Sequence, residues 1–149
     1  MGRHSSVKDP GYRAFLYEDD LDIAESMKIV VTTPATGSYW LAVDTVSHTT
    51  ALETLIEDVT ISAAGTALTF FCQNRQGDHP DNCACLIEHG GTYTGGTTLL
   101  QSVELRGQGD RRTLLKQSTS YQITVTSKAD DNWVSVLVAV WQGQNGDHA

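Results

Sequence analysis

Residues 121–141 read YQITVTSKADDNWVSVLVAVW and decide the fold class of this chain. Two runs rich in Val, Ile, Thr and aromatic residues flank a polar segment at 128–132 (KADDN). Branching at Cβ restricts helical rotamers but packs well on a pleated surface, so both runs predict β-strands. A short polar connection between two strands is typical of a hairpin. We therefore expect residues 121–127 to pair with residues 133–141.

Further segments toward the N-terminus have the same strand-like composition, and threonine is the most frequent residue of the chain. Short strands separated by frequent turns predict an all-β, single-domain β-sandwich of jelly-roll type. The sandwich is expected to span residues 12–142, between flexible arms at 1–11 and 143–149. The additional strands are expected at 12–17 (YRAFLY), 27–33 (MKIVVTT), 38–46 (SYWLAVDTV), 67–72 (ALTFFC) and 97–105 (TTLLQSVEL).

Two segments do not fit the strand pattern. Residues 51–59 (ALETLIEDV) carry Leu, Ile and Val at helical spacing, with Thr49 or Thr50 available as an N-cap. The same stretch could also be a strand followed by a bend, but we expect a short helix or an irregular edge segment here, so the fold contains at most one short helix. Residues 73–96 are rich in Gly, Asp and Asn and predict a long loop with a functional or interface role.

The charge balance excludes several classes of function. Among 149 residues, 18 acids oppose 10 bases, which gives a net charge of −8 and argues against a nucleic-acid partner. No apolar run approaches the ~20 residues that cross a bilayer, and the N-terminus lacks the apolar core of a signal peptide, so no membrane association is expected. The densest acidic stretch could supply oxygen ligands to Ca²⁺, but its spacing favours a solvated connection. It comprises Glu18, Asp19, Asp20, Asp22 and Glu25.

The cysteines form the sharpest local pattern of the sequence. Residues 79–89 (HPDNCACLIEH) place His79 and His89 symmetrically about Cys83 and Cys85. Two thiolates and two imidazoles are a sensible tetrahedral Zn²⁺ set, although the spacing is not that of a common zinc module. A disulfide that pairs two of the three cysteines, the third being Cys72, is an alternative. Free thiols are favoured over both, so no cofactor or metal is expected.

Catalytic signatures are missing from the sequence. The chain has no G-x-S-x-G elbow, and its glycine pairs Gly90-Gly91 and Gly95-Gly96 lack a Walker lysine, so we expect no enzymatic activity. Trp40, Trp133 and Trp141 could form a sugar-binding platform. On strands full of Val and Leu they are more typical of a core or a subunit interface.

A set of short motifs points to a family. The strongest are 114–121 (LLKQSTSY) and 126–132 (TSKADDN). The weaker ones, in chain order, are Thr33-Pro34, Glu57-Asp58, 62–69 (SAAGTALT), Gln73-Asn74-Arg75, 96–100 (GTTLL), Arg111-Arg112 and a last strand that ends at Trp141. Together they resemble a group of small tailed-bacteriophage head proteins, the capsid decoration or cement proteins, over residues 27–142.

The resemblance implies a structural role. Decoration proteins of this kind are β-sandwiches that trimerise at three-fold or quasi-three-fold positions of the head and oppose the pressure of packed DNA. The implied partners are the major capsid protein and two further copies of the chain, and the implied location is the exterior of the virion after synthesis in the host cytoplasm. The N-terminal segment is then expected to face the shell. Its candidate interface residues are Arg3, His4, Lys8, Tyr12, Arg13 and Phe15.

Two other classes of function stay open. A phage fibre-tip or lectin-like module would recognise surface glycans through exposed aromatic residues near loops 73–96 or 106–113. A small jelly-roll hydrolase is the third class, but a cupin-type metal set would need an H-x-H pair, which the chain lacks. We rank the decoration protein first and the glycan-binding module second.

Overall fold

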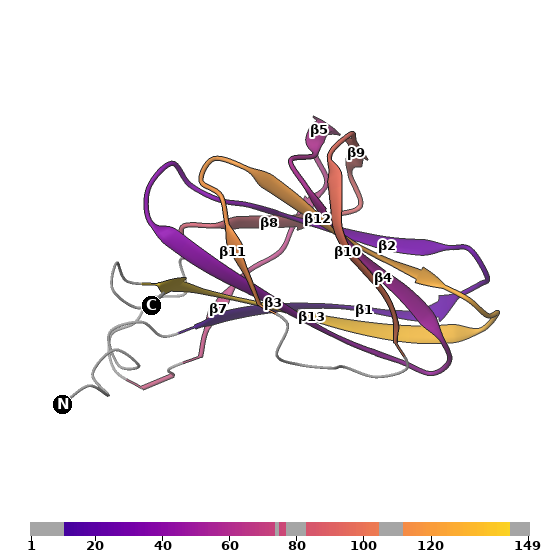
Figure 1. The fold of residues 1–149 in the computed structure, drawn as a ribbon. Helices are drawn as coiled ribbons and strands as arrows, with labels where there is room; N and C mark the ends of the chain where they lie inside the picture. Colours follow the sequence, from indigo (N-terminus) through magenta and orange to yellow (C-terminus); the bar gives the residue numbers. More distant parts are fainter. Residues whose placement is uncertain (1–10, 74, 77–82, 105–111, 144–149) are drawn as a thin grey trace.

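The computed structural model describes residues 11–73, 75–76, 83–104 and 112–143, and these residues form a β-sandwich. A five-stranded sheet has the order β11-β3-β13-β1-β7, and a six-stranded sheet has the order β10-β4-β12-β2-β8-β6. All pairings within them are antiparallel. Figure 1 shows the two sheets as two layers, with β1, β3 and β13 in one and β2, β4 and β12 in the other.

The strand boundaries place both ends of the described chain in the five-stranded sheet. That sheet contains β1 (Tyr12–Leu21), β3 (Ser38–Ser47), β7 (Phe71–Cys72), β11 (Arg112–Leu115) and β13 (Asn132–Gly143). The six-stranded sheet contains β2 (Ser26–Thr32), β4 (Ala51–Glu57), β6 (Thr66–Ala67), β8 (Leu86–His89), β10 (Thr97–Glu104) and β12 (Ser120–Ser127). A separate two-stranded ribbon pairs β5 (Thr60–Ala63) with β9 (Thr92–Thr94).

The connectivity is that of a jelly roll. Eight strands, β1 to β4 and β10 to β13, make up the jelly roll. Four of them have the order β11-β3-β13-β1 in one sheet, and the other four have the order β10-β4-β12-β2 in the other sheet. Along the chain these strands switch sheet at every connection except the one from β4 to β10, which is the pattern of two interlocked Greek keys. The strands β5 to β9 are inserted at that one connection. The predicted jelly-roll β-sandwich is therefore confirmed.

The core lies between the two sheets and follows the period of two along each strand. In β13, the even-numbered residues from Val134 to Val140 are fully buried and face inward. Tyr121, Ile123 and Val125 of β12 are buried at the same spacing in the opposite sheet. At about 25 cal/mol per Å² of apolar surface removed from water, these two strands supply much of the energy that holds the layers together.

The helix expected at residues 51–59 is wrong, because this segment forms β4 between β10 and β12. Ala51 and Leu55 face the core, while Ile56 faces outward and packs against a second small apolar cluster. Apolar residues on both faces of one strand imitate the spacing of a helix, and only tertiary packing distinguishes the two. None of the described residues is helical, and so none forms a helix able to cross a membrane.

The expected hairpin of residues 121–127 and 133–141 is also wrong. Strand β12 pairs with β2 and β4, whereas β13 pairs with β1 and β3 in the other sheet. A five-residue connection is long enough to cross the ~10 Å between packed sheets, so its length fits both arrangements. The crossing is fixed by Asn132, whose fully buried amide binds the backbone of Thr49 and the hydroxyl of Ser127.

The region predicted as one long loop, residues 73–96, contains strands β8 and β9. The ribbon of β5 and β9 covers part of the outer face of the six-stranded sheet, where Val30, Val59 and Tyr93 form the second buried cluster. Figure 1 shows this ribbon projecting from the layer of six, on the side away from β1 and β13. The predicted arms lie outside the described residues, apart from Gly11 and Gly143.

Candidate interaction surface on the five-stranded sheet

The outer face of the five-stranded sheet carries large apolar side chains where an exposed antiparallel sheet is normally polar. In β13 the residues that alternate with the buried valines are half-buried and point outward: Trp133, Ser135, Leu137, Ala139 and Trp141. Apolar residues on both faces of a strand are typical of a strand that is packed on both sides. The inner face of β13 packs against the six-stranded sheet, but none of the described elements packs on its outer face.

The neighbouring strands extend the same surface, which we call the aromatic face. Phe15 and Tyr17 of β1 are 62% and 53% exposed, and Leu114 of β11 is 47% exposed. Five of the eight exposed large apolar side chains of the described structure belong to this one face. The aromatic face comprises Phe15, Tyr17, Trp40, Val46, Phe71, Leu114, Trp133, Leu137 and Trp141.

The strand register arranges these side chains in rows across the sheet. Trp40 of β3 lies opposite both Trp141 of β13 and Leu114 of β11, which makes one continuous apolar row. Phe15 lies opposite Leu137 in a second row. Directly opposed residues of an antiparallel pair are close enough to contact, so each row presents one joined surface to a partner.

A row of small residues separates the two apolar rows. Ala139 lies opposite Ala42 on one side and opposite Arg13 on the other, and Arg112 lies opposite Ala42. The two alanines form a low strip between the two rows of larger side chains, with Arg112 beside Ala42 and Arg13 beside Ala139, and Phe71 beyond Arg13. This relief gives a partner a shape to fit as well as an apolar area to bury.

The polar groups of the face are held in defined positions. The guanidinium of Arg112 lies 5.4 Å from the ring centre of Trp141, within the range of a cation–π contact. Arg13 donates from Nη2 and Nε to the side-chain oxygen of Gln73, in the amide orientation that satisfies both groups. At the end of the face, the ring of His48 stacks on Trp133 at a centroid distance of 6.1 Å. His48 is exposed.

The structure places the predicted interface residues in different environments. Arg13 and Phe15 lie on the aromatic face, whereas Tyr12 is half-buried and packs against the core. Arg3, His4 and Lys8 lie outside the described residues. The sequence did not single out Tyr17 or Leu114, and it placed the three tryptophans in a core or an interface without a choice between them. Strand alternation alone does not say which face of an apolar strand is covered.

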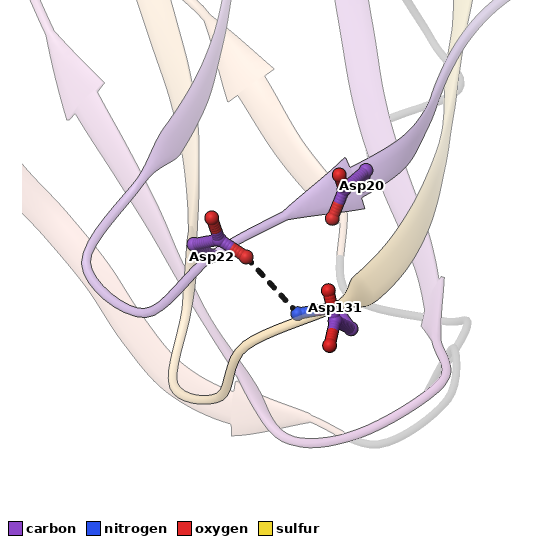
Figure 2. Close-up of side chains that lie close together, drawn as sticks. All are labelled: Asp20, Asp22 and Asp131. Atoms are coloured by element: carbon purple, nitrogen blue, oxygen red, sulfur yellow. Dashed lines mark hydrogen bonds between the residues drawn. The ribbon is translucent and has the colours of Figure 1, made fainter.

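The acidic stretch of the sequence forms the end of β1 and the turn that leads to β2, at one end of the sandwich. Asp20 and Asp22 come within 4.8 Å of Asp131, which the turn between β12 and β13 supplies, and all three are exposed (Figure 2). The backbone N–H of Asp131 donates to Oδ1 of Asp22 at 3.2 Å, and that of Ile23 donates to Oδ1 of Asp130 at 3.0 Å. The carboxylates of Asp22 and Asp130 thus cap the backbone of two facing turns.

Mutual repulsion is the electrostatic consequence of this cluster. The pKa of Asp20 is raised, chiefly by the charge of Asp22, with smaller contributions from partial burial and from Asp131, Asp19 and Glu25. A raised pKa means that the folded state disfavours the ionised carboxylate. The cluster is a charged, exposed end of the molecule and lies apart from the rows of the aromatic face.

The zinc set, which the sequence offers as an alternative to free thiols, is not assembled by the described residues. Cys83, Cys85 and His89 do not converge into a common ligand group within the described chain, and His79 lies outside it. The structure describes all three cysteines, and each is a free thiol. Cys83 and Cys85 instead line a cavity of about 600 Å³ beside β8, with Leu68 and Phe70 among its apolar walls.

The residues that carry the family motifs gather at two turns. Thr33 accepts from the backbone N–H of Thr119 at 3.0 Å and donates to the carbonyl of Lys116 at 2.6 Å. The buried hydroxyl of Tyr121 donates to Glu57 at 2.9 Å and accepts from the backbone N–H of Lys116 at 2.7 Å. Segments far apart in the sequence therefore meet in one hydrogen-bonded cluster that fixes the β11–β12 connection.

The other strong motif, residues 126–132, supplies the second cluster. Ser127 and Asn132 hydrogen-bond to each other at 3.1 Å, and Asn132 accepts from the backbone N–H of Thr49 at 2.8 Å. Both motifs therefore stabilise connections of the jelly roll rather than the aromatic face.

No protein-family model, curated protein or solved structure matches this chain.

Proposed function

We propose that this chain is a non-enzymatic structural protein that decorates and stabilises the head of a tailed bacteriophage. In this proposal a homotrimer sits at three-fold or quasi-three-fold positions on the outside of the capsid and binds the major capsid protein. The single observation that carries the proposal is the aromatic face, because a soluble sheet with this apolar relief is built to be covered by protein. The motifs of residues 114–121 and 126–132 supply the family to which the proposal refers.

The physical role follows from linkage. A protein that binds the assembled lattice but not its dissociated subunits stabilises the lattice by mass action. Three copies joined as a symmetric trimer present three docking faces at once, so a modest contact per copy becomes tight attachment of the whole. A jelly roll held by two packed sheets is rigid enough to transmit that force.

The charge distribution supports a defined orientation. The described charged groups within the rows of the aromatic face are Arg13, Arg112 and the single acid Asp44, whereas Asp20, Asp22 and Asp131 gather at one end of the sandwich. An acidic exposed end keeps a densely coated particle soluble. The aromatic face is therefore proposed to point toward the capsid or a sister subunit, and the acidic end toward water.

The proposal is tested with purified protein and heads built from the major capsid protein of the genome that encodes this chain. Native mass spectrometry is expected to show a trimer, and sedimentation of the heads is expected to carry the protein into the pellet at a fixed ratio. Heads in the unexpanded state serve as the comparison. A chain that stays monomeric and remains in the supernatant with expanded heads contradicts the proposal.

A glycan-binding module is the second candidate, and one observation favours it. Trp40 and Trp141 lie opposite each other on neighbouring strands, and Arg112 lies over the ring of Trp141, which places two indole side chains beside a hydrogen-bond donor. Sugar rings stack on such platforms. A glycan array separates the two candidates, since specific hits that Trp141→Ala abolishes support the module, and an empty array supports protein binding.

A further inference from the structure

Cys83 and Cys85 lie together at the wall of the cavity beside β8. Cys85 is 2% exposed and belongs to the core, while Cys83 is half-buried and packs against the same core. Both side chains line the cavity of about 600 Å³, whose walls include Leu68, Phe70 and Leu86. A cavity of this size admits a small molecule, so Cys83, the less buried of the two, can be reached from it, while Cys85 lies behind it in the core.

The local backbone brings the two thiols toward each other. Two residues of fully extended chain span about 6.6 Å, close to the upper limit of the Cα separation that a disulfide bridges. The chain bends at Ala84 and Cys85 just before β8 begins, which shortens this span. This spacing and the shared cavity wall place the two thiols near each other, and the lowered pKa of Cys83, caused chiefly by hydrogen bonding from the Cys85 thiol, agrees with that placement.

The third cysteine provides an internal comparison. Cys72 is buried in β7, a strand of the other sheet that pairs with β1, and it does not line this cavity. Proximity of two thiols and access through a cavity are therefore combined only at Cys83 and Cys85.

We propose that Cys83 and Cys85 form a reactive dithiol site that a peroxide oxidises to an intrachain disulfide. The Cys83 thiolate attacks one oxygen of the peroxide, the O–O bond breaks, and a sulfenic acid forms as hydroxide leaves. The sulfur of Cys85 then attacks the sulfenic sulfur, the S–O bond breaks, and the disulfide forms as water leaves. In total two thiols lose two electrons and two protons, and hydrogen peroxide is reduced to two waters.

The division of roles follows from the contacts. The hydrogen bonds from Cys85 stabilise the negative charge on the Cys83 sulfur, and the pKa of Cys83 is lowered mainly by the thiol of Cys85. The pKa of the Cys85 thiol is raised by the same contact and by burial. Cys83 is therefore the attacking thiol and Cys85 the resolving one.

The proposal is tested on the folded full chain with hydrogen peroxide, thiol titration and intact mass. Oxidised protein is expected to retain one titratable thiol of three and to lose the mass of two hydrogens, and peptide mapping is expected to place this loss in the single peptide that contains both Cys83 and Cys85. The matched control Cys72→Ser is expected to form the same disulfide. Cys85→Ser is expected to stop at a sulfenic acid on Cys83, which a dimedone reagent traps.

A second measurement does not depend on oxidation. Phenylarsine oxide, a trivalent arsenical that bridges two adjacent thiols, is expected to bind the reduced protein in a one-to-one adduct. Cys83→Ser should lose this adduct and Cys72→Ser should keep it. Three thiols that survive peroxide, a cross-link that involves Cys72, or an arsenical adduct that persists in Cys83→Ser overturns the proposal.

Discussion

At the scale of single residues, the core is specified by a few buried polar groups as well as by its aliphatic side chains. Glu53 of β4 points between the sheets and accepts a hydrogen bond from Thr45 of β3 at 2.7 Å. This contact joins the two layers through side chains in the middle of the sandwich. A buried carboxyl group that loses a donor pays its desolvation cost without compensation, so such a pair constrains how the two sheets register.

Thr45→Val keeps the shape of the side chain and removes the hydroxyl that donates to Glu53. We expect the free energy of unfolding to fall by about 1–3 kcal/mol, as measured by urea denaturation. Thr45→Ser retains the hydroxyl and should lose less. Equal stability of Thr45→Val and the unaltered protein would show that Glu53 does not need this donor.

Tyr121 makes stability depend on pH in alkaline solution. Its pKa is raised from 10 to about 12, chiefly by burial, and its hydroxyl is the centre of the β11–β12 cluster. The folded state thus holds the proton that the unfolded state releases first. Its contribution is fully present below the unfolded pKa and is lost as the pH rises toward the folded one.

We therefore expect the unaltered protein to lose stability between about pH 9 and 11, and Tyr121→Phe to lose less over the same interval. Denaturation at both pH values measures the two losses. The pKa of Tyr93 is also raised to about 12, so Tyr93 accounts for part of the loss of stability that remains in Tyr121→Phe. Identical losses in the two proteins would mean that Tyr121 is not responsible.

At the scale of elements, the facing turns at the acidic end carry an electrostatic penalty. The pKa of Asp20 is raised by its acidic neighbours, so this group favours folding below its unfolded pKa of 3.8, and the benefit is lost as the pH rises through the folded value. Asp20→Asn should raise the melting temperature at neutral pH and low salt. The gain should shrink at ~1 M salt, where charges are screened beyond ~3 Å. A lower melting temperature for the variant would contradict this account.

The two faces of the five-stranded sheet should respond differently to the same substitution. Leu41 of β3 is 1% exposed and faces the core, whereas Leu114 of β11 is on the aromatic face. Leu41→Ala is expected to cost about 2–5 kcal/mol. Leu114→Ala is expected to change the free energy of unfolding by only ~0.5 kcal/mol. Thermal denaturation measures both, and a large cost at Leu114 would make the aromatic face a part of the core.

The sequence predicted the strands with strong composition and missed those whose pairing comes from distant residues. Strands β2, β3, β10, β12 and β13 lie within a few residues of their predicted bounds. The short strand β11 has no alternation of its own and exists because it pairs with β3. Strand β4 was predicted as a helix or edge segment because the apolar residues on both its faces have the spacing of a helix. The β12–β13 connection was predicted as a hairpin because its length fits either a hairpin or a crossing between the sheets.

At the scale of the whole molecule, the aromatic face is assembled from β1, β3, β11 and β13, which span most of the chain. The sequence shows that residues 133–141 carry apolar side chains on both faces of the strand. It does not show which of the two faces is exposed. The jelly-roll topology decides this, because it brings Phe15, Trp40 and Leu114 beside the outward residues of β13. The central claim is that this aromatic face binds the capsid.

The most direct test is quantitative co-sedimentation of expanded heads with the double variant Phe15→Ser/Leu114→Ser. Leu86→Ser is the matched control, because Leu86 is 70% exposed but belongs to β8 in the other sheet. The account predicts that the double variant folds, as measured by circular dichroism, and binds heads about tenfold or more weakly, a loss of ~1.4 kcal/mol. Leu86→Ser should bind like the unaltered protein. Unchanged binding of the double variant, or an equal loss in Leu86→Ser, would contradict the claim.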